Sequence, residues 1–351
     1  MLMLTSLLFF TLPVNAQGET VYIRADGTID PPTASILRDG DVYTFTDNIL
    51  GSIVVEKSNI IIDGNGYALQ GSGSGKGFQL DGIDNVTIHN VIIKGFANAI
   101  VINVSSFNVI SGNTIQDNGG FMGSVILESP YSNYNNTFSG NTFSNNTGSC
   151  IVLHGLYATV SDNIIANNTG LGINLDSGYI TVSGNIITNN TGGGIAVYGW
   201  NNNVFGNNVT NHTSELTGQG ILLDFGASTN NVVGNIIEDN KVGILLGDSS
   251  DNTIAHNNFI SNTKQAISDS INIWDNGSEG NYWSDYTGTD SNSDDVGDTP
   301  YVIDENNQDN YPLMAQVDIS VIPEISSLVP IACLFALAVA IAVYKRRVSK
   351  N

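Results

Sequence analysis

Seven asparagines recur at nearly even steps through the middle of the chain, and this repeat constrains the fold more than any other feature. Each step is 22 or 28 residues long, and most of the asparagines stand in near-copies of the phrase Ser-Gly-Asn-Ile-Ile. A fixed period in this range predicts one structural unit stacked on itself. The positions are Asn113, Asn141, Asn163, Asn185, Asn207, Asn235 and Asn257.

Apolar residues keep a fixed phase to each asparagine, as Val182 and Ile187 do around Asn185, and a further alternating pair such as Ile195 and Val197 follows. This pattern predicts three very short strands per unit. Units of this size bury a core only by stacking. We therefore predict an all-β fold, a right-handed parallel β-helix of nine or ten coils over residues 59–275. Left-handed helices, leucine-rich repeats and propellers fit the period less well.

The repeated asparagines are predicted to be structural. At a sharp corner, a buried amide can bond to the backbone and to its copies above and below. Removing one would leave a buried group unpaired, at about 1–3 kcal/mol. The two 28-residue steps predict loops that project at residues 117–136 and 210–219.

The two ends of the chain predict export and a membrane anchor. An apolar run and small residues close the first segment, although no Lys or Arg precedes it, so an uncleaved anchor stays an alternative. A charge-free run of 20 residues is followed by Lys345-Arg346-Arg347, which predicts a cytoplasmic C-terminus and a β-helix outside. The predicted parts are a signal peptide (1–16), an N-terminal cap (17–58), the β-helix (59–275), an Asp-rich C-terminal cap (276–314), a linker (315–324), a transmembrane helix (325–344) and a tail (345–351).

Charge limits the partners of the predicted exported part. It holds all 33 acidic residues and seven of the 11 basic ones, a net charge of −26. Such a field repels nucleic acid and polyanions and attracts cations. Neutral glycans or surface-layer proteins are the expected partners, with the lipid bilayer for the C-terminal helix.

Nine sequons of the form Asn-x-Ser/Thr are candidate glycosylation sites, although an Asn-rich repeat also produces sequons by chance. They begin at Asn85, Asn103, Asn135, Asn145, Asn167, Asn189, Asn208, Asn211 and Asn276. Cys150 and Cys333 fall on opposite sides of the predicted topology, so no disulfide joins them.

An Asp-rich loop follows the repeats. Asp290, Asn292, Asp294 and Asp298 place oxygen ligands at positions 1, 3, 5 and 9, the spacing of a calcium loop. Asp295 stands where an EF-hand has glycine, and no Glu occupies position 12. Structural calcium is one interpretation, and an acidic turn that caps the β-helix is the other.

The C-terminal phrases Gly280-Asn-Tyr-Trp-Ser-Asp-Tyr, Gly297-Asp-Thr-Pro-Tyr and Asn310-Tyr-Pro-Leu-Met resemble those of NosD-like β-helix proteins. The openings at Val21 and Ile60 look like archaeal surface members of that group. The resemblance implies periplasmic copper handling and repeats like those of carbohydrate-binding and sugar-hydrolysing β-helices. Copper needs clustered His, Cys or Met ligands. The four histidines are scattered along the chain, which argues against copper.

Carbohydrate chemistry is the other implication of the resemblance. A hydrolase needs two carboxylates, and Asp176, Asp224 and Asp248 follow third strands in three coils, although charged residues also protect sheet edges. A lyase needs a basic residue to take the proton and cations to hold the uronate, and the arginines of the predicted exported part, Arg24 and Arg38, both lie before the repeats. For sugar stacking the candidate rings are Tyr157, Tyr179, Tyr198 and Trp200, with corner packing as the alternative.

Together these features predict a single-pass cell-membrane protein with its β-helix outside, acting as a non-catalytic glycan-binding or surface-layer structural module. A polysaccharide-active hydrolase or lyase is the first alternative. A NosD-like copper-handling accessory protein is the second.

Overall fold

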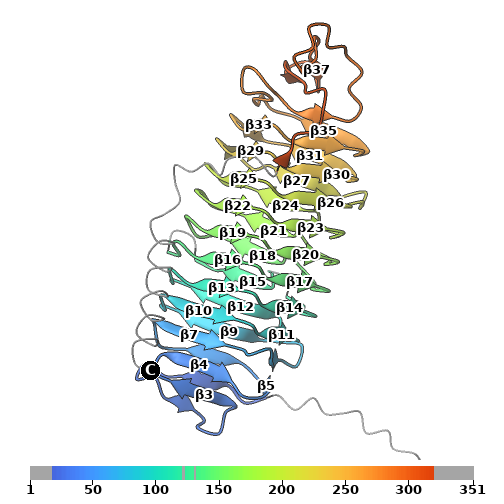
Figure 1. The fold of residues 1–351 in the computed structure, drawn as a ribbon. Helices are drawn as coiled ribbons and strands as arrows, with labels where there is room; N and C mark the ends of the chain where they lie inside the picture. The colour runs from blue at the N-terminus through green and yellow to red at the C-terminus, as the bar shows by residue number, and fades with distance from the viewer. Residues whose placement is uncertain (1–17, 121–122, 130–131, 320–351) are drawn as a thin grey trace, which may run out of the picture. The chain divides into compact units, whose positions relative to one another are not determined.

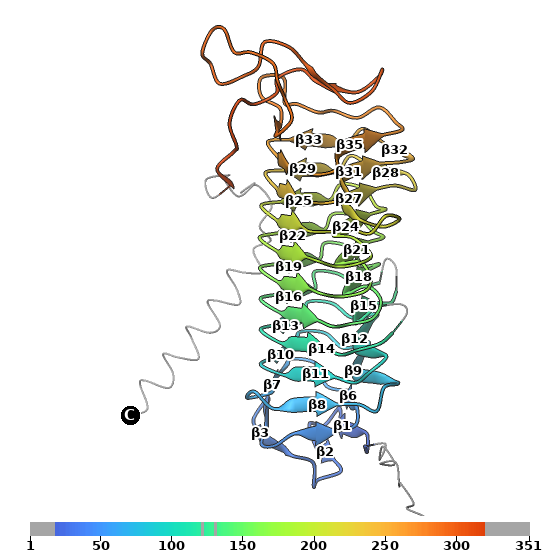
Figure 2. The same cartoon turned by 90° about the vertical axis from the view of Figure 1, so that its right-hand side faces the viewer.

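The computed structural model describes residues 18–120, 123–129 and 132–319, and these residues form a parallel β-helix (Figures 1 and 2). The predicted signal peptide, the predicted membrane span and the basic tail lie outside the described residues. Among the residues described, no helix is both long enough and apolar enough to cross a membrane.

Three long sheets run the length of the stack, and nearly all their pairings are parallel. Sheet A has 12 strands in the order β2 (Ile29–Asp30), β1 (Val21–Ile23), β6 (Ile53–Val55), β9 (Lys76–Asp81), β12 (Asn98–Asn103), β15 (Val125–Leu127), β18 (Ile151–Leu153), β21 (Ile173–Leu175), β24 (Ile195–Val197), β27 (Gln219–Leu223), β31 (Val242–Leu246) and β35 (Lys264–Ser268).

Sheets B and C have 11 strands each. Sheet B runs β3 (Ile36–Asp39), β4 (Val42–Phe45), β7 (Ile60–Asp63), β10 (Val86–His89), β13 (Val109–Ser111), β16 (Thr137–Ser139), β19 (Thr159–Ser161), β22 (Thr181–Ser183), β25 (Asn203–Phe205), β29 (Asn231–Val233) and β33 (Thr253–Ala255). Sheet C runs β5 (Ile49–Leu50), β8 (Ala68–Gln70), β11 (Ile92–Lys94), β14 (Thr114–Gln116), β17 (Thr142–Ser144), β20 (Ile164–Ala166), β23 (Ile186–Thr188), β26 (Asn208–Thr210), β30 (Ile236–Glu238), β34 (Asn258–Ile260) and β36 (Tyr282–Trp283).

Two small pairs complete the strands: β28 (Ala227–Ser228) with β32 (Ser249–Ser250), and β37 (Tyr301–Val302) with β38 (Gln308–Asp309). The parallel β-helix prediction is confirmed, but the expected nine or ten coils are too few. With 11 strands in each of sheets B and C, the stack has about 11 coils. Strands β4 to β6 precede residue 59 and β36 follows residue 275, where the repeat pattern is weak.

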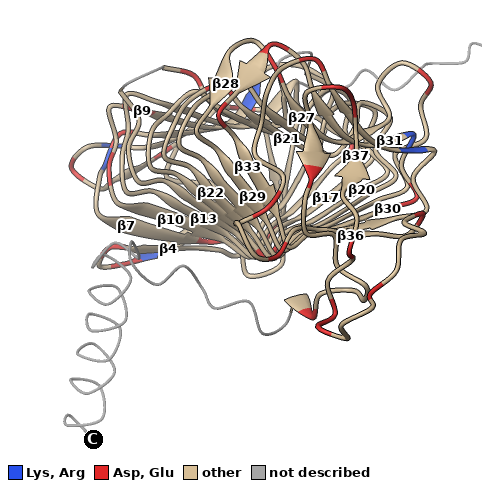
Figure 3. Ribbon diagram, turned by 90° about the horizontal axis from the view of Figure 1, so that it is seen from above, with Lys and Arg blue, Asp and Glu red and all other residues tan. Residues whose placement is uncertain are grey.

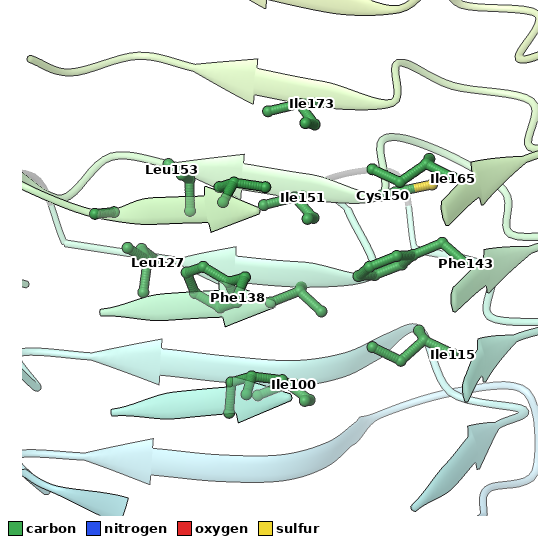
Figure 4. Close-up of a cluster of buried hydrophobic side chains, with 14 of the residues drawn as sticks. Ile100, Ile115, Leu127, Phe138, Phe143, Cys150, Ile151, Leu153, Ile165 and Ile173 are labelled. Atoms are coloured by element: carbon green, nitrogen blue, oxygen red, sulfur yellow. The ribbon is translucent and has the colours of Figure 1, made fainter. Parts of the chain in front are cut away.

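The core is a stack of apolar side chains inside the coils. In sheets B and C the middle residue of each short strand points inward, whereas in sheet A the first and third residues do. Ile151, Leu153 and Ile165 meet in this way, with Cys150 beside them (Figure 4). Each inward residue sits on its copy in the next coil, so the core is continuous from coil to coil.

Three buried asparagine stacks line the corners, although the repeat analysis identified one. In the identified stack, Asn185 Nδ2 donates to the Val160 carbonyl (3.0 Å) and to Asn207 Oδ1 (2.9 Å). A second stack includes Asn146, Asn168 and Asn190. A third includes Asn108, Asn136, Asn202, Asn230, Asn252 and Asn272. In all three, the coil nearer the N-terminus donates and the next coil accepts.

The residue before each inward corner residue adopts a left-handed backbone. Asp162, Asn167 and Asn189 all have φ between 51° and 59°. Short polar residues and glycine tolerate this conformation. The chain turns there and leaves the side chain pointing outward, while the following asparagine turns into the core.

A buried cap closes the C-terminal end of the stack. Trp283 stacks between Phe259 (4.4 Å) and Tyr301 (4.2 Å). Its Nε1 and the Asn281 backbone N–H both donate to Asp309 Oδ2, at 2.8 and 2.7 Å. Thus the GNYWSDY phrase ends the first asparagine stack on a buried carboxylate.

Candidate functional site

The outer face of sheet A carries two parallel rows of side chains at β18, β21 and β24. Because alternate residues of a strand share a face, the middle strand residues and the first loop residues lie on the same side. Backbone pairing holds them in register from coil to coil. We call this set the three-coil window. Its residues are Val152, Asn174 and Ala196 in one row, and His154, Asp176 and Tyr198 in the other.

The second row consists of groups that can hydrogen-bond or exchange protons. His154 Nδ1 lies 3.1 Å from Asp176 Oδ2, and both side chains are about one-quarter to one-third exposed. Burial, followed by the charges of Asp176 and Asp224, raises the pKa of the Tyr198 hydroxyl. Tyr198 therefore stays a hydrogen-bond donor at neutral pH. Glu128 extends the row on one side and pairs with Lys76, and Asp224 extends it on the other.

The first row is apolar except at its centre. Val152 is 5% exposed and Ala196 is fully buried, although both are on the outer face of the sheet. Asn174 lies between them, and its buried Oδ1 has no hydrogen-bond partner among the described residues. A polar atom in this state costs free energy unless a ligand or water meets it.

Longer loops border the window on both sides. The loops from sheet A to sheet B in the three window coils are short, such as residues 154–158. In the preceding coil the loop spans residues 128–136, and in the following coil residues 224–230. The predicted insertions thus divide between two corners of each coil, because residues 117–124 and 211–218 are also lengthened.

Aromatic rings stand three residues beyond the polar row. Tyr157 and Tyr179 are 47% and 45% exposed, and their rings stack at 5.0 Å with an interplanar angle of 18°. Both have a left-handed φ, 58° and 60°, at the corner where other coils place Phe107, Asn201, Thr229 or Asp251. Bulky residues rarely adopt this conformation, and such outliers gather at functional sites. Each ring covers one face of the other, so the pair presents its edges and outer faces.

The other two candidate rings also border the window. Tyr198 meets the 76%-exposed Phe225 edge to face at 5.4 Å. Trp200 packs over Gly178, since a Cβ on that glycine would lie 2.9 Å from the indole Nε1. The four predicted rings therefore share the loops between sheets A and B in three successive coils.

Two of the three candidate catalytic carboxylates share the polar row. Asp176 and Asp224 stand two coils apart, roughly 10 Å by strand spacing, with Tyr198 between them. Asp224 Oδ1 accepts from the backbone N–H groups of Phe225 (2.8 Å) and Asp248 (3.1 Å). Asp248 is one residue past the row, because Gly247 occupies the row position.

The Asp-rich loop uses its side chains within its own turns. Asp290 accepts from the backbone N–H groups of Ser293 and Asp295, and Asn292 Nδ2 donates to Asp294. Asp298 accepts from Ser291, and this bond is the main reason why its pKa is lowered. Over the described ranges, no three His, Cys, Asp or Glu side chains are grouped to hold a metal ion. The arrangement fits an acidic cap, and structural calcium stays a prediction.

The histidines of the described residues are also poorly placed to bind copper. His89, His154 and His256 each lie beside a carboxylate on coils far apart, and His212 is buried in the second asparagine stack. Clustered imidazole or sulfur donors are what copper prefers. The described side chains do not supply that donor set.

The sequons fall into two structural groups. Those at Asn145, Asn167, Asn189 and Asn211 have outward side chains at left-handed corners between sheets C and A in successive coils, whereas Asn85 and Asn135 are at left-handed corners between sheets A and B. In contrast, Asn103 lies in β12 bonded to Asp81, Asn208 lies in β26 with its Oδ1 buried, and Asn276 caps its own turn.

Sequence reasoning missed three features of this site. It considered His154 only as one of four scattered histidines, it did not single out Asn174, and it did not place Tyr198 in the same row as the carboxylates. The signal was present: each row residue is the first residue after a third-strand pair.

Comparison with known proteins confirms the NosD resemblance. Residues 130–288 match the model of the family described as "Periplasmic copper-binding protein (NosD)". A "Probable ABC transporter binding protein NosD" of Pseudomonas aeruginosa is 38% identical over 88 residues, which is 24% of this chain and 21% of that protein. The Stutzerimonas stutzeri protein of the same name is 36% identical over 93 residues, 25% and 21% of the two chains. The chain thus spans about a fifth of these relatives, and both are bacterial, which lends no support to an archaeal origin.

Solved β-helices are similar at low identity. The A-module of the Azotobacter vinelandii mannuronan C-5 epimerase matches with a TM-score of 0.47 and 13% identity, over 73% of this chain and 71% of that one. A bacteriophage HK620 tailspike mutant, solved in complex with a pentasaccharide, matches with a TM-score of 0.45 and 13% identity, over 74% and 55% of the two chains.

Proposed function

Since residues 130–288 are NosD-like, we propose that this β-helix acts outside the cytoplasm and binds a neutral carbohydrate at the three-coil window. The observation that carries the proposal is the row of His154, Asp176 and Tyr198, set beside exposed rings in the same three loops. The predicted segment 325–344 would tether the domain to the membrane.

The polar row suits sugar hydroxyl groups. Sugar hydroxyls both donate and accept hydrogen bonds, and the row offers a carboxylate acceptor, a phenol donor and an imidazole. Few precisely placed polar groups among apolar ones are typical of ligand sites. The exposed apolar groups beside this row are the rings of Tyr157 and Tyr179, since Val152 and Ala196 are enclosed.

The rings supply apolar contact at the margin of the site. Tyr157 and Tyr179 hold a backbone conformation that costs roughly 1–3 kcal/mol each, and Asn201 in the next coil shows that asparagine fits the same corner. Ring edges and hydroxyls at this position can pack against a sugar and bond to it at once.

Charge selects against anionic sugars. Asp176, Asp224 and Glu128 follow one edge of sheet A, and acidic residues outnumber basic ones on the loops around the coils (Figure 3). Lys76 is already paired with Glu128. A polyuronate or sulfated glycan would be repelled, whereas a neutral one would not.

The test is binding of the domain spanning residues 17–319 to an array of neutral oligosaccharides, followed by calorimetry on the strongest probe. Tyr198→Phe and Asp176→Asn should weaken binding about tenfold each, as expected for the loss of a hydrogen bond to a charged or buried partner. Asp162→Asn, at a left-handed corner between sheets B and C, should bind like the wild type. Equal affinity in all four proteins, or no binding to any array sugar, would overturn the proposal.

A polysaccharide-active enzyme is the second candidate, and the contact between His154 and Asp176 favours it. A carboxylate on Nδ1 orients an imidazole so that its other nitrogen can take or give a proton. The backbones at Asp176 and Asp224 are roughly 10 Å apart, slightly above the roughly 6.5–9.5 Å that separates the carboxyl groups of inverting glycosidases. Incubating the domain with bound polysaccharide and measuring new reducing ends or unsaturated products separates the candidates. Products that vanish in His154→Asn would establish catalysis, and their absence would leave binding alone.

A further inference from the structure

We propose that Asn174 is the residue that determines specificity in the three-coil window, and that its amide bonds to a hydroxyl group of the carbohydrate. This inference rests on the proposed function and identifies the Asn174 amide as the group that recognises the ligand. It starts from a partly exposed amide: Asn174 Oδ1 is enclosed without a partner among the described residues, while the other end of the amide is open to the outside.

Asn174 departs from the pattern of its own row. The outer-face position of sheet A is apolar in every neighbouring coil from β12 to β35. The aligned residues are Val101, Ile126, Val152, Asn174, Ala196, Leu222, Leu245 and Ile267. Seven apolar residues show that the fold accepts an apolar side chain here, so the amide has no evident structural duty.

The location of Asn174 is the centre of the window. Asp176 lies on the same face as Asn174, two residues further along the chain and roughly 7 Å from it by strand geometry. The neighbours of Asp176 in that row are His154 and Tyr198. A ligand that touches the polar row therefore reaches Asn174 from the same side.

A hydroxyl is the group that fits this amide. Because Asn174 Oδ1 is enclosed, the exposed end of the amide is the end that a ligand meets. A hydroxyl group can pair with either end of an amide, because it donates and accepts. An apolar ligand would cover the exposed end without pairing it and would be disfavoured.

Two substitutions copied from neighbouring coils test the inference. Asn174→Ala reproduces Ala196, and Asn174→Val reproduces Val152. We expect both variants to melt at the wild-type temperature or above it, because they remove an unpaired buried polar atom. We expect both to bind the strongest probe from a panel of cellohexaose, maltohexaose, mannohexaose and chitohexaose roughly tenfold more weakly.

Changing the ligand as well as the protein completes a double-mutant cycle, in which one change removes the amide and the other removes a sugar hydroxyl. Among singly deoxygenated analogues of that probe, one should lose affinity for the wild type but not for Asn174→Ala. Wild-type binding with unchanged affinity in both variants would overturn the role of Asn174 and leave the proposed function standing. Variants that melt well below the wild type would show a structural role instead. If the wild type binds neither these four sugars nor any other neutral sugar of the array, both proposals fail.

Discussion

At the residue scale, the corners of the β-helix are built from two adjacent residues with different roles. In Asn189–Asn190, the first residue takes the left-handed backbone and faces solvent, and the second is buried in an asparagine stack. The sequence repeat predicts the stack that includes Asn185 because its apolar neighbours keep phase. The second stack was not predicted because its asparagines directly follow sequon asparagines, which were assigned to the surface. The third was not predicted because Ala158 and Ile180 interrupt its repeat.

Removing one stacked asparagine should destabilise the β-helix. Asn185→Ala deletes the donor to the Val160 carbonyl and to Asn207, and the acceptor for the Asn163 backbone N–H. Each unpaired buried group costs about 1–3 kcal/mol, so we expect a loss of about 3 kcal/mol in chemical denaturation. Asn189→Gly, exposed and left-handed in the same coil, should lose little. Equal losses would contradict the stack interpretation.

The one histidine within the second stack should make stability depend on pH. Burial lowers the pKa of His212 from its ordinary value of 6.5 to about 4. Between these values the unfolded chain binds a proton that the folded chain does not, so stability falls as pH drops from about 6.5 to 4. The full shift corresponds to about 3 kcal/mol.

Melting curves between pH 7 and pH 4 check this effect. His212→Asn should melt with a shallower pH dependence than the wild type, because asparagine already fills this position in neighbouring coils. His256→Asn, at a partly exposed corner beside Glu279, serves as the control and should retain the dependence on His212. Parallel curves for wild type and His212→Asn would refute the assignment.

At the element scale, the loops between sheets A and B carry the candidate function, and the sequence predicts them only in part. The alternating third strands predict where each loop begins, so Asp176 and Asp224 could be named in advance. The contact of His154 with Asp176 depends on coil register, and the isolation of Asn174 depends on what its neighbours leave unpaired. A periodic pattern locates residues on a strand but does not reveal which polar atoms find partners.

Replacing Tyr157 at its left-handed corner should have opposite effects on the stability of the protein and on its affinity for the oligosaccharide. Tyr157→Asn places a residue that tolerates φ of 58° where a bulky ring now sits. We expect thermal stability to rise by an amount equivalent to about 1 kcal/mol, while affinity for the neutral oligosaccharide falls. Tyr67→Asn, remote from sheet A and half-buried, should not reduce affinity. A variant that is both less stable and equally competent in binding would show that the ring is there for packing.

At the scale of the whole molecule, the sequence predicts a β-helix displayed at a membrane by its last segment. The described residues establish the β-helix, whereas residues 325–344 lie beyond them. Deleting residues 325–351 should move the protein from the membrane fraction to the soluble fraction of its host without changing its melting temperature. A full-length chain that is already soluble after cell fractionation would argue against the anchor.

The one-way hydrogen bonding of the asparagine stacks makes the β-helix an electrically polar object. The bonds from amide to amide all run toward the C-terminal coil, so the dipoles of these bonds add head to tail, while the second N–H of an amide such as Asn185 donates to a carbonyl of the preceding coil. The donor end of the first stack meets the carboxylate of Asp309, a negative charge where the summed field is positive. Burial raises the pKa of the Asp309 carboxyl, whereas hydrogen bonds from Asn281 and Trp283 lower it. The charge at the end of the stack therefore depends on both effects. The asparagine stacks therefore give the β-helix a direction along its axis, from donor coil to acceptor coil. A coil can be inserted or deleted in register only if its asparagines keep this direction of hydrogen bonding.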